Sequence, residues 1–377
     1  MNKFLKRKQV LSLIKAIGHK RTVLVEGEAG CGKTAMHYEL AADPAFKGYY
    51  TPKPVDCTQL SDGSVWMPDL DRSRGVSREL PNERWGVNDE NHKGVVGARP
   101  ALLCLDEIGK TRQFIKDVLA PIVYERRVGN YEMPEGSVVF GCTNLTDEGL
   151  GDNMQAHLRN RLIIVQMDKP TKDEWVRDFA VPQELDAYVI AAVETYPMVF
   201  GSFMDYRQGG AHAGKTIARE NPYISDPANV AQEQVVTPRS LHAASDVMLA
   251  REGLDDVTLQ GALAGTIGAA FAANVMSMMR FGEQLPAYAR VIADPAGAPL
   301  PTNPTAQVVQ CFQLIKQVQD KEEAEAAAEY VQRMRAEMKG LFVNTVANSN
   351  NGRMTAFAMS ATFNDMLREN RDFLRNV

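Results

Sequence analysis

Cysteine is scarce in this sequence, and its spacing forms no recognisable pair. The five cysteines are an odd number and include no C-x-x-C motif. Most of them lie in or beside apolar runs, as buried thiols do, so we expect reduced thiols in a cytoplasmic protein rather than a disulfide framework. These residues are Cys31, Cys57, Cys104, Cys142 and Cys311.

Positive charge is not in excess either. Lysine and arginine total 42 against 47 acidic residues, which gives a formal net charge of -5 and a pI near 5.8. This balance argues against a broad nucleic-acid-binding surface but leaves local basic patches open. Hydrophobic residues make up 45% of the 377 residues and charged residues 24%. Both values are typical of a globular protein of two or three domains.

The sequence lacks an unbroken apolar segment long enough to target or cross a membrane. The N-terminus combines basic and apolar residues, but Lys15 interrupts the apolar run, and we expect an amphipathic helix over 3–17 rather than a signal peptide. Residues 261–279 carry no charge, yet they are mostly Ala and Gly and include Thr266 and Asn274. A buried, closely packed helix is the better interpretation of that stretch.

One stretch of the chain carries the strongest functional signal. Residues 23–34 read VLVEGEAGCGKT, an apolar run followed by G-x-x-x-x-G-K-T, the phosphate-binding P-loop. Its glycines let successive backbone N–H groups turn toward one anion, and a helix starting near Gly32 adds the positive end of its dipole. The expected nucleotide-binding residues are Gly27, Glu28, Ala29, Gly30, Cys31, Gly32, Lys33, Thr34 and Ala35.

Three side chains of this loop have specific consequences. Lys33 can reach the β- and γ-phosphates of a nucleotide, and the Thr34 hydroxyl can hold Mg²⁺. Cys31 lies between two of the glycines, which predicts that the protein is sensitive to thiol alkylation.

An apolar strand ending in two carboxylates supplies the second half of a nucleotide site. Residues 101–105 are almost continuously apolar, as in a strand buried on both faces, and Asp106 and Glu107 follow. Asp106 can hold the Mg²⁺ shell, and Glu107 can polarise the attacking water. Asp106 to Gly109 also fits the D-x-x-G of a GTPase, but no N-K-x-D motif occurs, so we expect ATP as the nucleotide.

Four further polar residues are candidates with two interpretations each. Asn144 ends the next apolar strand, where its amide either contacts the γ-phosphate or attacking water, or simply starts a turn. Arg159 and Arg161 precede the fifth strand and are either surface charges or arginine fingers that reach a neighbouring subunit's nucleotide. Arg239 follows Thr-Pro, a helix start where the dipole disfavours a cation, so it either faces an anion or is solvated.

Strands and helices alternate up to about residue 170, which predicts a parallel α/β sheet with its ligand at the carboxyl ends of the strands. Residues 57–100 are charged and irregular and are interpreted as a functional insertion with little regular structure. Residues 128–136 read as a small hairpin. The rest of the chain looks almost wholly helical. We therefore divide it into an α/β nucleotide-binding domain, a helical lid and a helical C-terminal region, with ranges 1–170, 171–293 and 294–377.

Taken together, these motifs resemble an AAA+ ATPase, and within that class the MoxR-like branch. The 57–100 insertion stands where such proteins carry a helix-2 insert, and the 128–136 hairpin where they carry a pre-sensor-1 hairpin. The stretch DEGLGDNMQAHLRNRL is similar to bacterial and phage-encoded members. The resemblance covers about 11–249 and implies a five-stranded parallel sheet in the order 5-1-4-3-2, flanked by helices and followed by an all-α lid.

The resemblance also implies roles for the candidate residues. Lys33, Thr34 and Asp106 would bind nucleotide and Mg²⁺, and Glu107 would be the catalytic carboxylate of an ATP hydrolase. The sensors and the finger would be Asn144 (sensor 1), Arg239 (sensor 2) and one or both of Arg159 and Arg161, acting in trans. The expected assembly is a homo-oligomer, usually a hexameric ring, with ATP between neighbours.

Three functions remain open at this point. The resemblance implies a chaperone-like ATPase that remodels or activates a protein client, often with a partner bearing a von Willebrand factor A domain. A nucleic-acid motor or DNA-processing ATPase, serving phage replication or packaging, is supported by a local basic cluster on the insertion. A nucleotide-gated scaffold with negligible turnover is the third, and the intact Glu107 argues against it. The basic cluster comprises Arg72, Arg74, Arg78 and Arg84.

Overall fold

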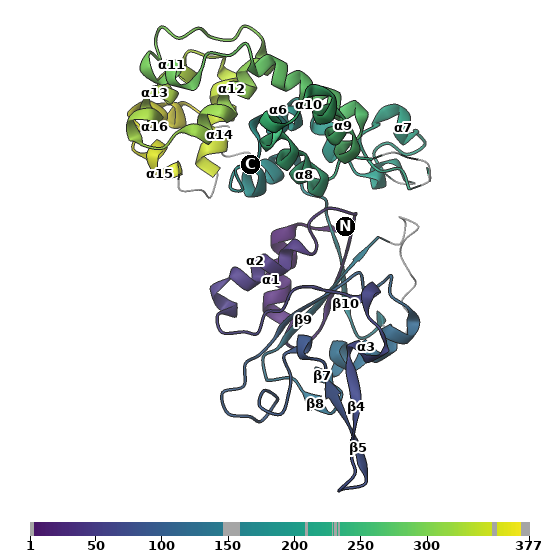
Figure 1. The fold of residues 1–377 in the computed structure, drawn as a ribbon. Helices are drawn as coiled ribbons and strands as arrows, with labels where there is room; N and C mark the ends of the chain where they lie inside the picture. The colour runs from purple at the N-terminus through teal and green to yellow at the C-terminus, as the bar shows by residue number, and fades with distance from the viewer. Residues whose placement is uncertain are drawn as a thin grey trace. The chain divides into compact units, whose positions relative to one another are not determined.

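The computed structural model divides the chain into two compact units, 1–169 and 170–377. Each unit is described by itself (Figure 1). The further division that the sequence predicts at residue 294 stays a prediction. The structure describes residues 4–145, 159–207, 210–227, 229, 232, 234–348 and 353–370. Most of the stretch that resembles phage-encoded members, residues 147–158, lies outside these residues.

The first unit is built on a six-stranded sheet in which every neighbouring pair is parallel. Its order is β1-β10-β2-β9-β6-β3. When β1 is left out and the other five strands are numbered along the chain, the order is 5-1-4-3-2. The predicted order is therefore confirmed, and the sheet has one strand more than expected. The strands are β1 (Phe4–Leu5), β2 (Val23–Gly27), β3 (Val55–Asp56), β6 (Leu102–Asp106), β9 (Val138–Asn144) and β10 (Ile163–Met167).

The extra strand corrects the prediction of one helix over 3–17. Helix α1 spans Arg7–Ile17, and the two residues before Lys6 form β1 instead, with Phe4 opposite Gln166. An outer strand leaves unpaired backbone groups along its edge, and β1 pairs with those of β10. A local helical pattern cannot reveal this pairing because the partner strand lies about 160 residues later.

Helices cover both faces of the sheet, because successive side chains of a buried strand point to opposite sides. Val23 and Val25 pack in one cluster with residues of α1 and of α2 (Ala35–Ala42), whereas Leu24 packs in another with residues of α3 (Gln113–Glu125). Figure 1 shows α1 and α2 on one side of the sheet and α3 on the other. This two-sided burial explains why the strands read as apolar runs rather than alternating patterns.

The 57–100 insertion has more regular structure than the sequence predicts. It contains an antiparallel hairpin of β4 (Trp66–Asp71) and β5 (Val76–Pro81), which extends away from the sheet (Figure 1). Most of its side chains are exposed or only partly buried, so neither face shows the alternation that marks a half-buried strand. In the middle of β5, the Arg78 guanidinium donates to the Tyr131 hydroxyl at 2.6 Å.

That tyrosine belongs to the second hairpin, which the sequence predicts at 128–136. Strands β7 (Arg127–Val128) and β8 (Tyr131–Glu132) form it, so the prediction is confirmed with its first strand starting one residue earlier. The backbone N–H of Asn130 donates to the Glu79 carbonyl at 3.2 Å. The two hairpins are therefore joined by both backbone and side-chain hydrogen bonds.

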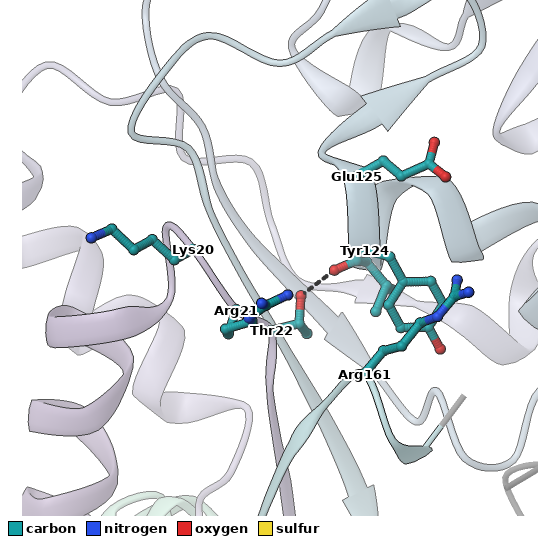
Figure 2. A pocket seen from close by; sticks show the side chains of 7 residues that line it. Lys20, Arg21, Thr22, Tyr124, Glu125 and Arg161 are labelled. Carbon is teal, nitrogen blue, oxygen red and sulfur yellow. Dashed lines mark hydrogen bonds between the residues drawn. The ribbon is translucent and has the colours of Figure 1, made fainter. Parts of the chain in front are cut away.

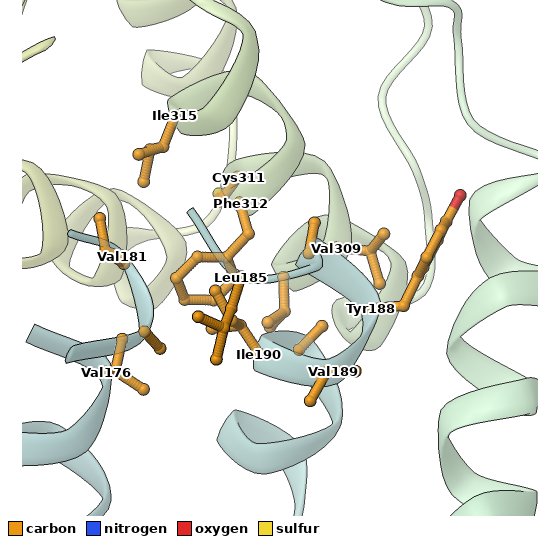
Figure 3. Close-up of a cluster of buried hydrophobic side chains, with 14 of the residues drawn as sticks. Val176, Val181, Leu185, Tyr188, Val189, Ile190, Val309, Cys311, Phe312 and Ile315 are labelled. Carbon is orange, nitrogen blue, oxygen red and sulfur yellow. The ribbon is translucent and has the colours of Figure 1, made fainter. Parts of the chain in front are cut away.

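Helices are the only regular elements among the described residues of the second unit, and turns and loops connect them. A single cluster of buried apolar side chains runs through it from Trp175 to Met366. Figure 3 shows part of it, with Phe312 of α12 facing Leu185 and Ile190. The helices are α5 (Lys172–Trp175), α6 (Ala187–Thr195), α7 (Ile217–Glu220), α8 (Pro238–Leu249), α9 (Asp256–Ile267), α10 (Ala269–Gly282), α11 (Tyr288–Ala293), α12 (Pro304–Gln317), α13 (Lys321–Gln332), α14 (Ala336–Asn348), α15 (Arg353–Ala358) and α16 (Ala361–Glu369).

The uncharged stretch 261–279 is divided between two helices rather than forming one. Helix α9 ends at Ile267 and α10 begins at Ala269, because Gly268 adopts a φ of 77° that interrupts the helix. Its buried residues, including Leu263 and Phe271, face the core, as predicted. Across the parts of the chain that the structure describes, no helix has the length and apolarity needed to cross a membrane.

Candidate functional site

The P-loop connects the carboxyl end of β2 to the start of α2. Gly30 and Gly32 have φ values of 72° and 89°, in the left-handed region that residues with a Cβ rarely adopt. Helix α2 begins at Ala35, three residues later than the predicted start near Gly32. The glycines are therefore required by the backbone that leads from the strand into the helix.

Lys33 is almost fully buried, with 7% of its surface exposed. Its ammonium donates to the carbonyls of Gly27 and Glu28, both at 2.8 Å, and to Oδ1 of Asn144 at 2.9 Å. Asn144 reaches it because β2 and β9 are neighbours and pair Gly27 with Asn144. The structure thus brings together two predicted site residues that are 111 positions apart.

Thr34 and Asp106 form the second contact between the two predicted halves of the site. The Thr34 hydroxyl donates to Oδ2 of Asp106 at 2.7 Å. Burial raises the pKa of Asp106, and the neighbouring Glu107 charge adds to that rise, while the bond from Thr34 opposes it. A hydroxyl and a carboxylate are the oxygen ligands that Mg²⁺ takes from a protein when phosphates and water supply the others. The described residues contain no cluster of three or more His, Cys, Asp and Glu that could enclose a metal alone.

Glu107 follows immediately and has an unusual backbone. Its φ is 52°, in the left-handed region, which is uncommon for a residue with a side chain. Its Oε2 atom lies 3.1 Å from the ammonium of Lys110. Apart from this ion pair, Oε2 is a buried oxygen with no hydrogen-bond partner among the described residues. A carboxylate oxygen in this condition is able to accept a hydrogen bond from a water or substrate.

Arg159 and Arg161 lie at the other end of the sheet. The register of β10 against β2, with Ile163 opposite Val23, puts residue 161 level with residue 21. Six residues of extended strand separate that level from Gly27, which is about 20 Å at roughly 3.3 Å per residue. Both arginines are exposed, and the Arg161 guanidinium lies 5.1 Å from the ring centre of Tyr124. Neither is positioned to reach the P-loop of its own chain.

Arg239 belongs to the second unit. The predicted helix start is confirmed: Thr237 caps α8, its hydroxyl accepts from the Ser240 N–H at 3.0 Å, and Pro238 is the first helical residue. Arg239 is exposed in the first turn of that helix. Its proposed contact with a nucleotide stays a prediction.

Two basic residues contact the site without any sequence signal. Arg7, at the start of α1, donates to the Gly32 carbonyl at 3.2 Å and to the Glu39 carboxylate at 2.6 Å. It therefore ties the P-loop backbone to helix α2. Lys110 is the other, through Glu107. Arg7 lies 25 residues before Gly32, so matching the P-loop motif does not find it. Lys110 lies close to Glu107 in the chain, but the motif does not specify its residue type.

All five cysteines are free and buried, as the sequence predicts. Cys31 has only 3% of its surface exposed, and burial raises the pKa of its thiol. Since the thiolate is the reactive species, these two properties argue against the rapid alkylation that its place in the P-loop suggests. The physical reason is that its side chain packs inward with Val25 and Met36.

Comparisons with known proteins give only distant matches. No family model and no curated protein matches the sequence. Among solved structures, the ADP complex of NtrX from Brucella abortus has a TM-score of 0.34 at 14% identity, covering 88% of this chain and 66% of that one. This chain thus spans slightly less than two thirds of NtrX.

Two further solved structures are similar at the same level. A mutant RuvB from Thermotoga maritima has a TM-score of 0.35 at 15% identity, with 79% of this chain and 78% of that one covered. A putative ATPase from Cytophaga hutchinsonii has a TM-score of 0.29 at 11% identity, with 97% and 90% covered. TM-scores this low carry no argument about function, so the case for the site rests on its own geometry.

Proposed function

We propose that the chain is an ATP hydrolase of the AAA+ class. One observation carries the proposal: Lys33, Thr34, Asp106 and Asn144 meet in hydrogen-bonded pairs at the carboxyl end of one parallel sheet. They come from three separate segments of the chain, and each is of the residue type that phosphoryl transfer needs. Glu107 adds a carboxylate oxygen without a hydrogen-bond partner among the described residues at the same edge.

The roles follow from the chemistry of each group. The Lys33 ammonium, now held by two carbonyls and the Asn144 amide, exchanges those acceptors for the β- and γ-phosphate oxygens of ATP. Thr34 and Asp106 supply oxygen ligands for Mg²⁺, which when bound neutralises charge on the phosphates. Glu107 accepts the proton of the attacking water, and Asn144 orients that water or contacts the γ-phosphate.

We further propose that the ATPase works as a homo-oligomeric ring, in the manner of MoxR-like proteins. Arg159 and Arg161 support this, because cations about 20 Å from their own P-loop could contact a nucleotide only if a neighbouring subunit held it. Arg239 serves as sensor 2. The ring, hexameric by resemblance, couples hydrolysis to the remodelling or activation of a protein client in the cytoplasm, with a von Willebrand factor A domain protein as the expected partner.

A second candidate is a nucleic-acid motor or DNA-processing ATPase, as in phage replication or packaging. The observation that favours it is the β4–β5 hairpin, where Arg72 and Arg74 are exposed in the turn. The nearby Asp71 and the pairing of Arg78 with Asp89 at 2.9 Å reduce that positive charge. DNA that stimulated hydrolysis with a steep dependence on salt would support this candidate over a protein client.

Two variants and one measurement test the proposal. Lys33→Ala should lose ATP binding, whereas Glu107→Gln should bind ATP, fail to hydrolyse it and trap the assembled ring. Light scattering on Glu107→Gln, with and without Mg·ATP, should show a shift from a smaller species to one of about six subunits, the ring size that a MoxR-like protein would have. A monomer under both conditions would contradict the ring, and normal hydrolysis by Glu107→Gln would contradict the site.

A further inference from the structure

A pocket of about 270 Å³ lies at the amino end of the sheet, at the opposite end from the P-loop. Three segments line it: residues 20–22 before β2, residues 123–125 at the end of α3, and Arg161 before β10. Figure 2 shows Arg161 lying across the ring of Tyr124, with Thr22 hydrogen-bonded to the backbone of α3. This volume is slightly below the range for small-molecule sites, which starts at roughly 300 Å³, so the pocket suits a small group.

The lining is strongly basic. Lys20, Arg21 and Arg161 contribute three positive charges, although Figure 2 shows the Lys20 side chain extending away from Tyr124 and Arg161. None of the three has a carboxylate within 4.0 Å among the residues that the structure describes. Glu125 is the single acidic residue of the lining, and its carboxylate pairs with Arg127 at 3.0 Å. The positive charges of Arg21 and Arg161 beside this pocket, with Lys20 close by in the chain, repel one another unless an anion lies between them.

A fourth cation, Arg126, contacts two of the residues that line the pocket, Thr22 and Val123. Its guanidinium donates only to neutral acceptors. These are the Thr22 hydroxyl at 2.8 Å and the carbonyls of Gly18, Val123 and Ile122 at 2.8, 2.6 and 3.3 Å. Its Nε atom is buried without a hydrogen-bond partner in the described part of the chain. Burial, together with the nearby charge of Arg21, lowers the pKa of Arg126 to about 10. Among the residues that the structure describes, this partly buried charge therefore has no carboxylate partner.

The end of helix α3 does not account for this charge. The C-terminus of a helix carries about half a negative charge, which favours one nearby cation. Arg126 already fills that role, because it donates to the last-turn carbonyls of Ile122 and Val123. Lys20, Arg21 and Arg161 remain in excess of what the helix end can balance.

We infer that this pocket binds a phosphate-bearing anion, with Arg21 and Arg161 as its cationic contacts and the exposed Lys20 side chain turning toward the anion when it binds. Tyr124 contributes through its ring. The ring holds Arg161 in place, so less side-chain entropy is lost on binding, and stacking leaves the guanidinium N–H edge free to donate.

Two sources could supply the same chemistry. The anion is either a free phosphate compound in solution or the phosphate end of a nucleotide held in the P-loop of a second copy of this chain. The second source, unlike the first, rests on the proposed function. In that case Lys20 and Arg21 join Arg161 in contacting the nucleotide of the neighbour.

The first experiment measures binding where the P-loop cannot contribute. Inorganic tripolyphosphate is titrated by calorimetry, at low salt, into the full chain carrying Lys33→Ala. We expect binding that weakens at least tenfold when Lys20→Ala and Arg21→Ala are added together. The matched control is Lys47→Ala with Arg290→Ala, which removes the same charge from exposed positions elsewhere and should change affinity less than twofold.

Absence of binding to the Lys33→Ala chain would overturn the inference, as would equal weakening by the pocket pair and the control pair. Urea unfolding of each variant verifies that it folds. Because this experiment uses neither ATP nor an intact P-loop, absence of tripolyphosphate binding would not contradict the ATPase proposal. Conversely, tripolyphosphate binding would still be valid if the ATPase proposal were wrong.

The second experiment identifies the source of the anion. Chains with an intact P-loop but carrying Lys20→Ala and Arg21→Ala are mixed with Lys33→Ala chains, which keep the pocket. Recovery of ATP hydrolysis in the mixture identifies the nucleotide of a second copy. If ATP hydrolysis does not recover, and the Lys33→Ala chain binds tripolyphosphate in the first experiment, the anion is a free phosphate compound.

Discussion

The strongest prediction concerns Glu107, where loss of activity should be separated from loss of stability. As general base, this carboxylate contributes about 10²- to 10⁴-fold to the rate, or about 2.7 to 5.4 kcal/mol at 1.36 kcal/mol per tenfold change. Its ion pair with Lys110 joins side chains that are 30% and 24% exposed, which is worth about 1 kcal/mol or less. Glu107→Gln should therefore lower kcat by 10²- to 10⁴-fold and change the free energy of unfolding by at most about 1 kcal/mol.

The backbone at this position allows a second, independent variant. The φ of 52° costs an ordinary residue roughly 1 kcal/mol, which glycine avoids, while glycine loses about 0.5 to 1 kcal/mol more entropy on folding. These terms nearly offset each other, so Glu107→Gly should be inactive and about as stable as the parent protein. Single-turnover hydrolysis and urea unfolding measure the two quantities. Glu220→Gln, in an exposed ion pair with Lys215, is the control that should leave both unchanged. A kcat within tenfold of the parent for Glu107→Gln would refute the assignment.

Three further predictions follow from the surroundings of the P-loop. Arg7→Ala should weaken ATP binding several-fold in an equilibrium titration, because the Gly32 carbonyl loses its link to α2. Arg7→Lys should not restore the affinity, since one ammonium cannot reproduce the two contacts of the guanidinium with Gly32 and Glu39. An unchanged Kd for Arg7→Ala would show that this link is dispensable. His37 is 2% exposed, its Nδ1 has no hydrogen-bond partner among the described residues, and burial lowers its pKa below 6.5. The stability that depends on its neutral form is therefore complete above pH 6.5 and is lost as the pH falls toward the lower folded-state pKa. Urea unfolding at pH 7.5 and 5.5 should show a larger loss for the parent than for His37→Gln, and equal losses would contradict this. Iodoacetamide should modify Cys31 slowly in the folded protein and quickly in urea, as mass spectrometry of its peptide can show; complete modification of the native protein within minutes would contradict the burial of this thiol.

Local motifs determined much of the site. The glycines, Lys33 and Thr34 of the P-loop act through backbone conformation and reach within a few residues, so their spacing is informative on its own. The strand that ends in Asp106 and Glu107 was equally visible, because a strand buried on both faces reads as an apolar run. The turn before α8 was found for the same reason, since Thr237 and Pro238 mark a helix start locally.

The tertiary structure decided everything that depends on partners distant along the chain. The edge strand at Phe4 forms because β10 offers unpaired backbone groups, and the β4–β5 hairpin is attached through Arg78 to a tyrosine of another hairpin. Exposed strands lack the alternation of apolar and polar residues that burial on one face produces, so the sequence pattern does not predict them. The position of Arg7 beside the P-loop could not be predicted either, because Arg7 lies outside the P-loop motif in the sequence.

The basic pocket shows the difference most clearly. Lys20, Arg21 and Arg161 are ordinary surface charges in the sequence, and Tyr124 is one aromatic residue at the end of a helix. Parallel pairing of β10 with β2 brings the starts of these strands side by side, and packing of α3 on the sheet adds its last turn. Sequence by itself determined the residues that bind through local backbone geometry. Folding alone decided which distant charges share one pocket, because electrostatic interaction depends on distance in space rather than along the chain.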